Sequence, residues 1–103
     1  MMGALKMLSR QTVIETLLAH QQQIQTFAVK TLFLFGSVAR DEAGAGSDVD
    51  LLVEFEKPVG LFTFIELKDY LEEILNCSVD LGTPQSLRPY LKDVVLREAV
   101  RAF

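Results

Sequence analysis

The hydrophobic positions divide the chain into short strands and longer helices. Continuous or alternating apolar residues predict strands over residues 30–35, 48–55 and 77–82. Apolar residues at helical spacing predict helices over residues 9–27, 61–75 and 87–101, the first with Ser9 as its N-cap. In the last of these helices the expected apolar contacts are Leu91, Val94, Val95 and Leu96. A short helical turn is expected over residues 36–40, and Gly44 and Gly46 predict a loop over residues 41–47.

The order of these elements predicts the topology of the sheet. The first strand is apolar on both faces, so we expect it to be central. For the end of the first strand to face the start of the second, the two strands should be antiparallel. A helix connects the second strand to the third, which favours a right-handed crossover and a parallel pair. We therefore predict an α/β (α+β) fold, with a small mixed β-sheet and helices packed on one face.

The alternation of side chains in the strands separates carboxylates from core residues. In the second strand Asp48 and Asp50 share one face, and in the third strand Asp80 lies on the corresponding face. Adjacent strands are ~4.8 Å apart, so the three aspartates should lie close together. The residues expected to face the helices are Val49, Leu51, Val53 and Phe55 in the second strand and Val79 and Leu81 in the third.

Length and composition restrict the class of protein. The 103 residues suffice for one domain, which we place at residues 9–103 after a flexible tail over residues 1–8. Half of the residues are apolar, which suggests that part of the apolar surface contacts a partner or a second copy of the chain; scattered exposed leucines on a tightly packed domain are the alternative. The net charge of −4 argues against direct binding to nucleic acid.

Cysteine usage and hydropathy indicate the compartment. Cys77 is the single cysteine, so it has no internal disulfide partner and fits a reducing environment. The sequence shows no signal peptide and no run of ~18 apolar residues that would span a membrane. A soluble cytoplasmic protein is expected.

Gly36 and Ser37 stand where the first strand passes into a helical turn. A glycine there lets the backbone approach a phosphate, and the free N–H groups of the turn point toward it. Arg40 follows three residues after Ser37, on the same side of the turn, where a charged contact to phosphate is expected. A surface ion pair of Arg40 with Asp41 or Glu42 is the alternative for that side chain.

The aspartates add the second half of a nucleotide site. Asp48 and Asp50 are ~7 Å apart along the strand, an unfavourable arrangement unless a cation or water screens the two charges. Magnesium takes carboxylate and phosphate oxygens, so both residues fit as ligands of Mg²⁺. Asp80 would share a second ion and accept the proton of an attacking hydroxyl. The alternatives are a solvated strand edge for the pair and an ordinary polar residue for Asp80.

The same residues carry a resemblance to a known family. Gly36-Ser37, ten residues and Asp48-Val49-Asp50 resemble the Gly-Ser-x10-Asp-x-Asp signature of the polymerase-β-type nucleotidyltransferase superfamily. Arg40 and Ser47 match the pattern as well. The length and the C-terminal half are similar to the minimal nucleotidyltransferases, the MNT or MntA group, in which a later strand carries a third aspartate that Asp80 matches.

This resemblance implies an activity and a partner. Members of the group are antitoxins paired with HEPN-domain ribonuclease toxins, and they transfer AMP from ATP to a toxin tyrosine. The resemblance therefore implies a protein adenylyltransferase with ATP as substrate and Mg²⁺, in two copies, as cofactor. Its catalytic and metal-binding residues would be Asp48, Asp50 and Asp80, and its nucleotide-binding residues Gly36, Ser37 and Arg40.

Two other functions are compatible with the sequence. A non-catalytic antitoxin would neutralise its toxin by masking it, with a site that is vestigial or only binds nucleotide. A stand-alone transferase would modify a small hydroxylated molecule, although this chain has no recognisable substrate lobe.

Overall fold

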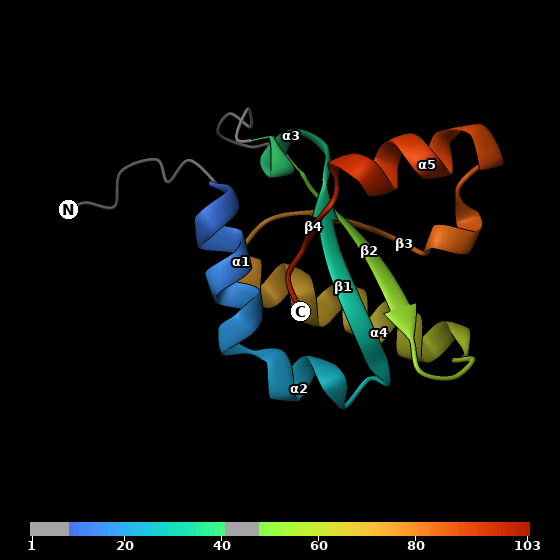
Figure 1. Ribbon diagram of the computed structural model, residues 1–103. Helices are drawn as coiled ribbons and strands as arrows, with labels where there is room; N and C mark the ends of the chain where they lie inside the picture. The colour runs from blue at the N-terminus through green and yellow to red at the C-terminus, as the bar shows by residue number, and fades with distance from the viewer. Residues whose placement is uncertain (1–8, 41–47) are drawn as a thin grey trace.

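The computed structural model describes residues 9–40 and 48–103, so the predicted tail over residues 1–8 and loop over residues 41–47 lie outside the described residues. The chain forms helices, strands and one 3₁₀ helix (Figure 1). In order these are α1 (Arg10–Ala19), α2 (Gln21–Gln25), β1 (Val29–Phe35), α3 (Gly36–Ala39), β2 (Val49–Phe55), α4 (Leu61–Leu75), β3 (Val79–Gly82), the 3₁₀ helix η1 (Pro84–Ser86), α5 (Pro89–Glu98) and β4 (Val100–Arg101).

The strands form one mixed sheet in the order β3-β2-β1-β4. β1 and β2 are antiparallel, and β2 and β3 are parallel, so both predicted pairings are confirmed. β4, which was not predicted, pairs with β1 in the antiparallel sense and makes β1 an inner strand. The predicted α/β (α+β) class with a small mixed β-sheet is confirmed, whereas α5 does not share the face of the other long helices.

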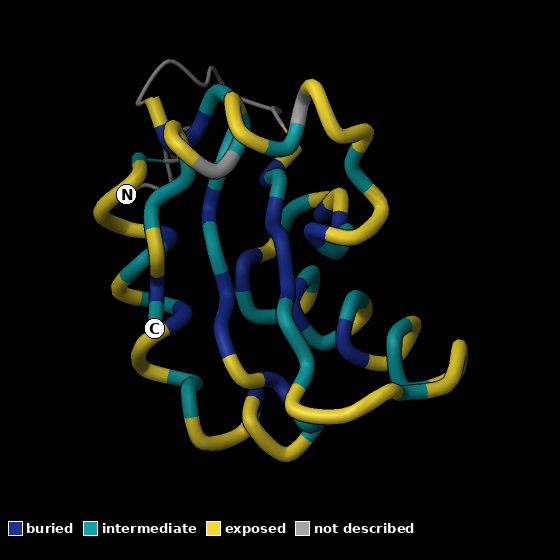
Figure 2. The backbone as a smooth tube through the Cα atoms, turned by 45° about the vertical axis from the view of Figure 1, so that its right-hand side comes forward, coloured by how far each residue is buried: buried dark blue, intermediate teal, exposed yellow. Residues whose placement is uncertain are grey.

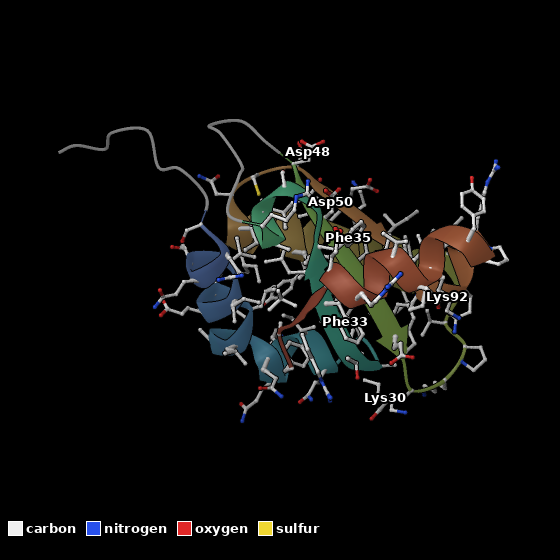
Figure 3. All side chains as sticks on the ribbon, turned by 45° about the horizontal axis from the view of Figure 1, so that its top comes forward. Lys30, Phe33, Phe35, Asp48, Asp50 and Lys92 are labelled. Carbon is white, nitrogen blue, oxygen red and sulfur yellow. The ribbon has the colours of Figure 1, made fainter. Side chains whose placement is uncertain are left out.

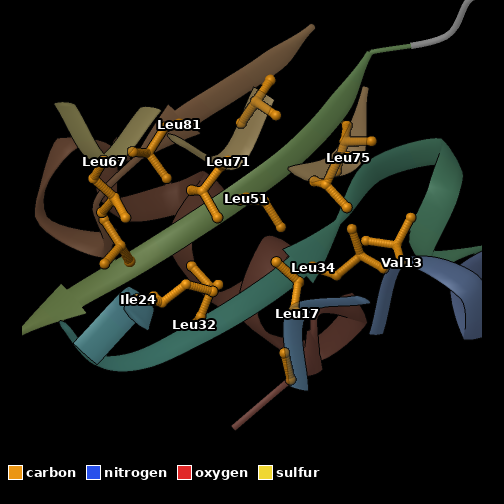
Figure 4. Packing of buried hydrophobic residues seen from close by; sticks show 14 of the residues in the cluster. Val13, Leu17, Ile24, Leu32, Leu34, Leu51, Leu67, Leu71, Leu75 and Leu81 are labelled. Atoms are coloured by element: carbon orange, nitrogen blue, oxygen red, sulfur yellow. The ribbon is translucent and has the colours of Figure 1, made fainter. Parts of the chain in front are cut away.

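The core lies between one face of the sheet and the helices α1, α2 and α4 (Figures 2 and 4). α4 was predicted with its observed bounds because three leucines recur every four residues along one side of it. Leu67, Leu71 and Leu75 are buried in the core cluster, and burial of such a side chain contributes about 1.5–3 kcal/mol. Asn76 ends the helix in a left-handed conformation with φ 54°.

The strands place their side chains as the alternation predicted. Val49, Leu51 and Val53 are buried in the core cluster, and the half-buried Phe55 packs against it. In β3, Val79 and Leu81 are buried, again on the side of the helices. The intervening residues of both strands therefore lie on the other face of the sheet.

The N-terminal helical segment differs from the prediction of one helix to residue 27. Ser9 is the N-cap, as predicted, since its side chain accepts a hydrogen bond from Thr12 N at 3.0 Å. The helix stops at His20, however, and α2 begins one residue later. The His20 ring bonds Thr16 O through Nδ1 at 2.8 Å and meets Tyr70 edge-on at 6.2 Å. The bend brings α2 under β1, where Ile24 is fully buried.

The C-terminal segment also differs from its prediction, because the last helix ends at Glu98 rather than near residue 101. The residues after it extend along β1: Ala102 N donates to Leu32 O at 2.8 Å, and Leu32 N donates to Phe103 O at 3.2 Å. These bonds satisfy backbone groups of β1 that a longer α5 would leave unpaired.

α5 leaves exposed Val94, one of the residues predicted as its apolar contacts. Val94 is 44% exposed and Val95 is half-buried, while the side chains of Leu91 and Leu96, also predicted contacts, lie outside the description. α5 lies on the opposite side of the sheet from α4, in front of it in Figures 1 and 3. The expectation of a buried stripe is therefore wrong for Val94.

The surface retains large apolar side chains. Leu61, Phe62 and Ile65, at the start of α4, are 73%, 85% and 44% exposed. We call these three residues the α4 patch. Across the part of the chain that the structure describes, no helix is both long enough and apolar enough to cross a bilayer.

Candidate active site

Asp50 and Asp80 lie side by side on the face of the sheet opposite the core. Strand pairing aligns Phe35 of β1 with Asp50 of β2, and Asp50 with Asp80 of β3, so the three residues form a row across the sheet. Asp50 is half-buried and Asp80 is exposed. Asp48 is exposed at the start of β2, close to Asp50 at the same end of the strand (Figure 3). The sequence thus correctly placed both strand aspartates on the open face.

Gly36 faces this row from the end of β1. Its φ is +78°, in the region that favours glycine. A Cβ atom built at this position would overlap Asp50 Oδ2 and lie 3.1 Å from Asp50 Cγ. Both the backbone conformation and the lack of space therefore require glycine, and the close approach shows that the Gly36-Ser37 corner and Asp50 border the same site.

The short helix α3 continues from this corner. Ser37 is half-buried in its first turn, and Arg40 N donates to Gly36 O at 3.2 Å. Arg10 of α1 donates from Nη1 to Ala39 O at 3.3 Å, where α3 ends. The corner is therefore fixed to α1 as well as to β1.

Arg40 is engaged with another element of the protein. Its Nη1 lies 3.5 Å from Glu98 Oε1, at the end of α5, and both side chains are about half exposed. An ion pair of this exposure contributes little to stability. The alternatives predicted for Arg40 were a contact to phosphate and a surface ion pair with Asp41 or Glu42. Asp41 and Glu42 lie outside the described residues, so the second alternative stays a prediction.

The electrostatics of the site centre on Asp50. Burial raises the pKa of Asp50, and the charges of Asp80 and then of Asp48 raise it further, whereas the charge of Arg40 lowers it. Asp50 is therefore repelled by the charges of both Asp80 and Asp48. Ionised Asp50 is disfavoured by its surroundings, and a cation near the row would reverse that effect.

The residues of the row fit a magnesium ion that a bound nucleotide helps to hold. Within residues 9–40 and 48–103, no group of three or more His, Cys, Asp or Glu side chains is arranged to hold a metal ion. Magnesium, however, is commonly bound by one or two carboxylates together with substrate phosphates. Asp50 and Asp80 supply oxygen donors on adjacent strands, and the Asp50 carboxylate lies directly against the Gly36 backbone.

Two contacts beside the site had not been predicted. Arg10 reaches Ala39 across 29 residues of sequence, and Arg40 reaches Glu98 across 58. Neither Arg10 nor Glu98 stands in a local motif, so the pattern of the sequence contained no signal for them. Their roles depend on how α1 and α5 are placed around α3.

The sequence is similar to known nucleotidyltransferases over most of its length. The family model of the nucleotidyltransferase domain matches residues 14–102. The chain is 42% identical over 95 residues to the protein adenylyltransferase MntA of Thermococcus cleftensis, covering 91% of this chain and 96% of that protein. It is also 42% identical over 88 residues to a protein of Methanocaldococcus jannaschii named "Putative protein adenylyltransferase", covering 84% of this chain and all of the relative.

Solved structures show the same fold. One of them, named "Structure of putative minimal nucleotidyltransferase", superposes with a TM-score of 0.80 at 36% identity and covers 95% of this chain and 98% of its own. One chain from the complex of a tri-AMPylated Shewanella oneidensis HEPN toxin with an MNT antitoxin aligns with a TM-score of 0.65 at 19% identity. The alignment covers 91% of this chain and 71% of that chain. At this low identity the second likeness is one of fold.

Proposed function

This chain belongs to the nucleotidyltransferase domain family, and from that membership we propose that it is an antitoxin that transfers AMP from ATP to a tyrosine of a HEPN ribonuclease toxin. The observation that carries the proposal is the row of Asp50 and Asp80 facing the Gly36-Ser37 corner. Support for the donor and for a protein acceptor comes from the relative named as a protein adenylyltransferase. Support for the partner comes from the toxin–antitoxin complexes of the same fold.

The corner would hold the triphosphate. Backbone at Gly36 can approach phosphate oxygens because no side chain intervenes, and the Ser37 hydroxyl can donate to one of them. Arg40 would add a charged contact, exchanging its exposed pair with Glu98 for the nucleotide. The α-phosphorus of ATP would then lie toward the aspartates.

The aspartates would hold Mg²⁺, two ions in our proposal, and direct the attack. Asp48, directly before β2, and Asp50 on β2 would be ligands, and Asp80 on β3 would complete the set when the ions bind. Bound Mg²⁺ would supply charge neutralisation for the phosphates. Asp80, the exposed member of the pair on β2 and β3, would accept the proton of the tyrosine hydroxyl as it attacks.

The acceptor would be a separate protein. The α4 patch leaves Phe62 85% exposed, and exposed apolar patches mark contact sites. A HEPN toxin docked on this chain would present its tyrosine to the open face of the sheet. We place the pair in the cytoplasm, in agreement with the lone Cys77.

The proposal is tested by incubating the protein with α-labelled ATP, MgCl₂ and the HEPN protein encoded beside it. We expect label on the HEPN protein, located on tyrosine by mass spectrometry, and none when EDTA replaces MgCl₂. Asp48→Asn combined with Asp50→Asn should reduce labelling at least about a hundredfold. Gly36→Ala should do the same, because its Cβ would displace Asp50.

Glu73→Gln, an exposed change on α4, is the matched control and should label at the wild-type rate. An unlabelled partner under all of these conditions would refute the enzymatic proposal.

Masking of the toxin by binding alone is the second candidate function, and the exposed α4 patch is the observation that favours it. Growth rescue separates the two. If catalysis neutralises the toxin, the double aspartate variant should fail to rescue cells while still binding the toxin. Full rescue by that variant would support masking.

A further inference from the structure

One peptide group beside the aspartate row is held from both sides. Ser78 O accepts a hydrogen bond from Val49 N at 3.0 Å, which joins β3 to β2. On the other side of the same peptide, Val79 N donates to Glu72 Oε2 of α4 at 2.9 Å. The C=O and N–H of a trans peptide point in opposite directions, so Glu72 binds β3 from the side that faces away from β2.

This second contact matters because β3 is a short edge strand. It has four residues and a neighbour on one side only. Edge N–H groups have no partner in their own sheet, and short edges fray readily. The Glu72 carboxylate supplies the missing acceptor at Val79, the first residue of the strand.

The carboxylate is itself held in place. Lys68, one helical turn earlier on α4, contacts the same Oε2 atom through Nζ at 3.2 Å. The Glu72 side chain is 31% exposed, so it is partly shielded from water. The hydrogen bond from Val79, and after it that from Lys68, lowers the pKa of Glu72, which keeps the acceptor ionised at neutral pH.

The held peptide lies next to the proposed metal ligands. Val79 directly precedes Asp80, and Val49 separates Asp48 from Asp50. The depth and register of β3 against β2 decide how far the Asp80 carboxylate lies from that of Asp50, with which it is paired.

We propose that Glu72 is a positioning residue that sets the Asp50–Asp80 separation by holding the start of β3. This inference rests on the proposed function, since it assumes that the two aspartates share metal.

The test measures Mn²⁺ binding to the whole chain by electron paramagnetic resonance, without nucleotide or toxin. Glu72→Ala removes the acceptor and should weaken Mn²⁺ binding roughly tenfold, the lower end of the range for residues that support metal ligands. Glu72→Gln keeps an oxygen acceptor for Val79 N and should recover affinity to within about threefold of wild type. Lys68→Met keeps the acceptor and should also stay within about threefold.

Glu73→Ala is the matched control, because Glu73 is the exposed neighbour of Glu72 on the same helix, and it should bind Mn²⁺ as the wild type does. Hydrogen exchange at the Val79 amide provides a second readout: it should accelerate in Glu72→Ala and not in Glu73→Ala. A role confined to stability would lower the melting temperature of Glu72→Ala while Mn²⁺ affinity, measured well below that temperature, stayed unchanged.

Wild-type Mn²⁺ affinity in a folded Glu72→Ala variant would overturn this inference and leave the proposed function standing. If Glu72→Ala does not fold, a loss of affinity in Glu72→Gln as large as ten-fold would overturn it, because that variant keeps the acceptor. If the wild type binds Mn²⁺ only when a non-hydrolysable ATP analogue is present, the variants are compared with that analogue added. A wild-type chain that binds Mn²⁺ in neither condition would overturn the proposed metal site and this inference together.

Discussion

Burial and the charges of Asp80 and Asp48 all raise the pKa of Asp50. This residue contacts the glycine corner, pairs with Asp80 across the sheet and follows Asp48 by two positions. Its raised pKa means that the folded protein binds a proton at Asp50 more tightly than the unfolded chain does. In the absence of metal, the folded state therefore loses stability as the pH rises from the ordinary value of 3.8 through the raised pKa of Asp50.

Asp50→Asn should remove that loss. At pH 7 without metal we expect a gain of about 0.5 kcal/mol in unfolding free energy, because the substitution removes the burial of a charged carboxylate and its repulsion by Asp80 and Asp48. This corresponds to a melting temperature roughly 2–4 °C higher for a chain of this size. Well below the ordinary pKa, where both forms are neutral, the two melting curves should coincide.

Differential scanning calorimetry in EDTA at both pH values measures the effect. Asp69→Asn, an exposed change on α4, serves as the control. A melting temperature for Asp50→Asn below that of the wild type at pH 7 would contradict the electrostatic account. MgCl₂ should raise the melting temperature of the wild type and leave that of Asp50→Asn nearly unchanged.

At the scale of residues, the sequence predicted the features that depend on strand alternation and on backbone chemistry. Asp50 and Asp80 were placed on the open face because strand side chains alternate, and Gly36 was chosen because a phosphate requires a close backbone. Glu72 and Glu98 had no such signal. Each is one of several acidic residues on a helix, and only the packing of α4 and α5 gives it a partner.

At the scale of elements, β4 and the break between α1 and α2 are features that the sequence did not predict. The residues after Glu98 continue an apolar and charged pattern that suits a helix, and nothing local marks the change at Ala99. The strand forms because β1 offers unpaired backbone groups, which are far away in sequence. By contrast, α4 was predicted with its observed bounds, because its leucine spacing and the Pro58 and Gly60 that precede it are local signals.

Ala102→Pro should show how much the pairing of the C-terminal residues with β1 contributes to the free energy of unfolding. The substitution removes the N–H that donates to Leu32 O at 2.8 Å, at a residue that is 7% exposed. We expect a loss of about 2–3 kcal/mol in unfolding free energy, since Leu32 O would be left without this partner and the pyrrolidine ring would disturb the pairing. Urea unfolding followed by circular dichroism measures it.

Ala102→Gly keeps the N–H group and should lower the free energy of unfolding by about 1 kcal/mol or less. The difference between the two variants therefore separates the contribution of the hydrogen bond from that of the side chain. Equal losses for Ala102→Pro and Ala102→Gly would show that the backbone bond is unimportant.

At the scale of the whole molecule, the α4 patch and the candidate site lie at different ends of β2. Asp50 stands near the start of the strand, and the α4 patch follows its end after a short connection. A strand of seven residues spans about 20 Å. A partner that contacts the α4 patch and also brings a tyrosine to the aspartates must therefore extend along the length of the sheet.

Phe62→Ser tests whether the toxin uses the α4 patch. Phe62 is 85% exposed, so the change should leave the melting temperature unaltered while lowering affinity for the HEPN protein at least about tenfold, as for an aromatic residue at the centre of an interface. Isothermal titration calorimetry gives the affinity. Leu18→Ser, at a 45% exposed residue of α1, is the control and should bind normally. Affinity within twofold of the wild type for Phe62→Ser would place the contact elsewhere.

The four-residue length of β3 affects how any measured activity should be interpreted. A shift of β3 by one residue would turn Asp80 toward the helices and an apolar neighbour toward the solvent. Such a misaligned conformer would keep most of its circular dichroism but bring no carboxylate to Asp50. The fraction of competent molecules in a purified sample is thus distinct from the fraction that is folded, and stoichiometric titration with nucleotide is the way to count it.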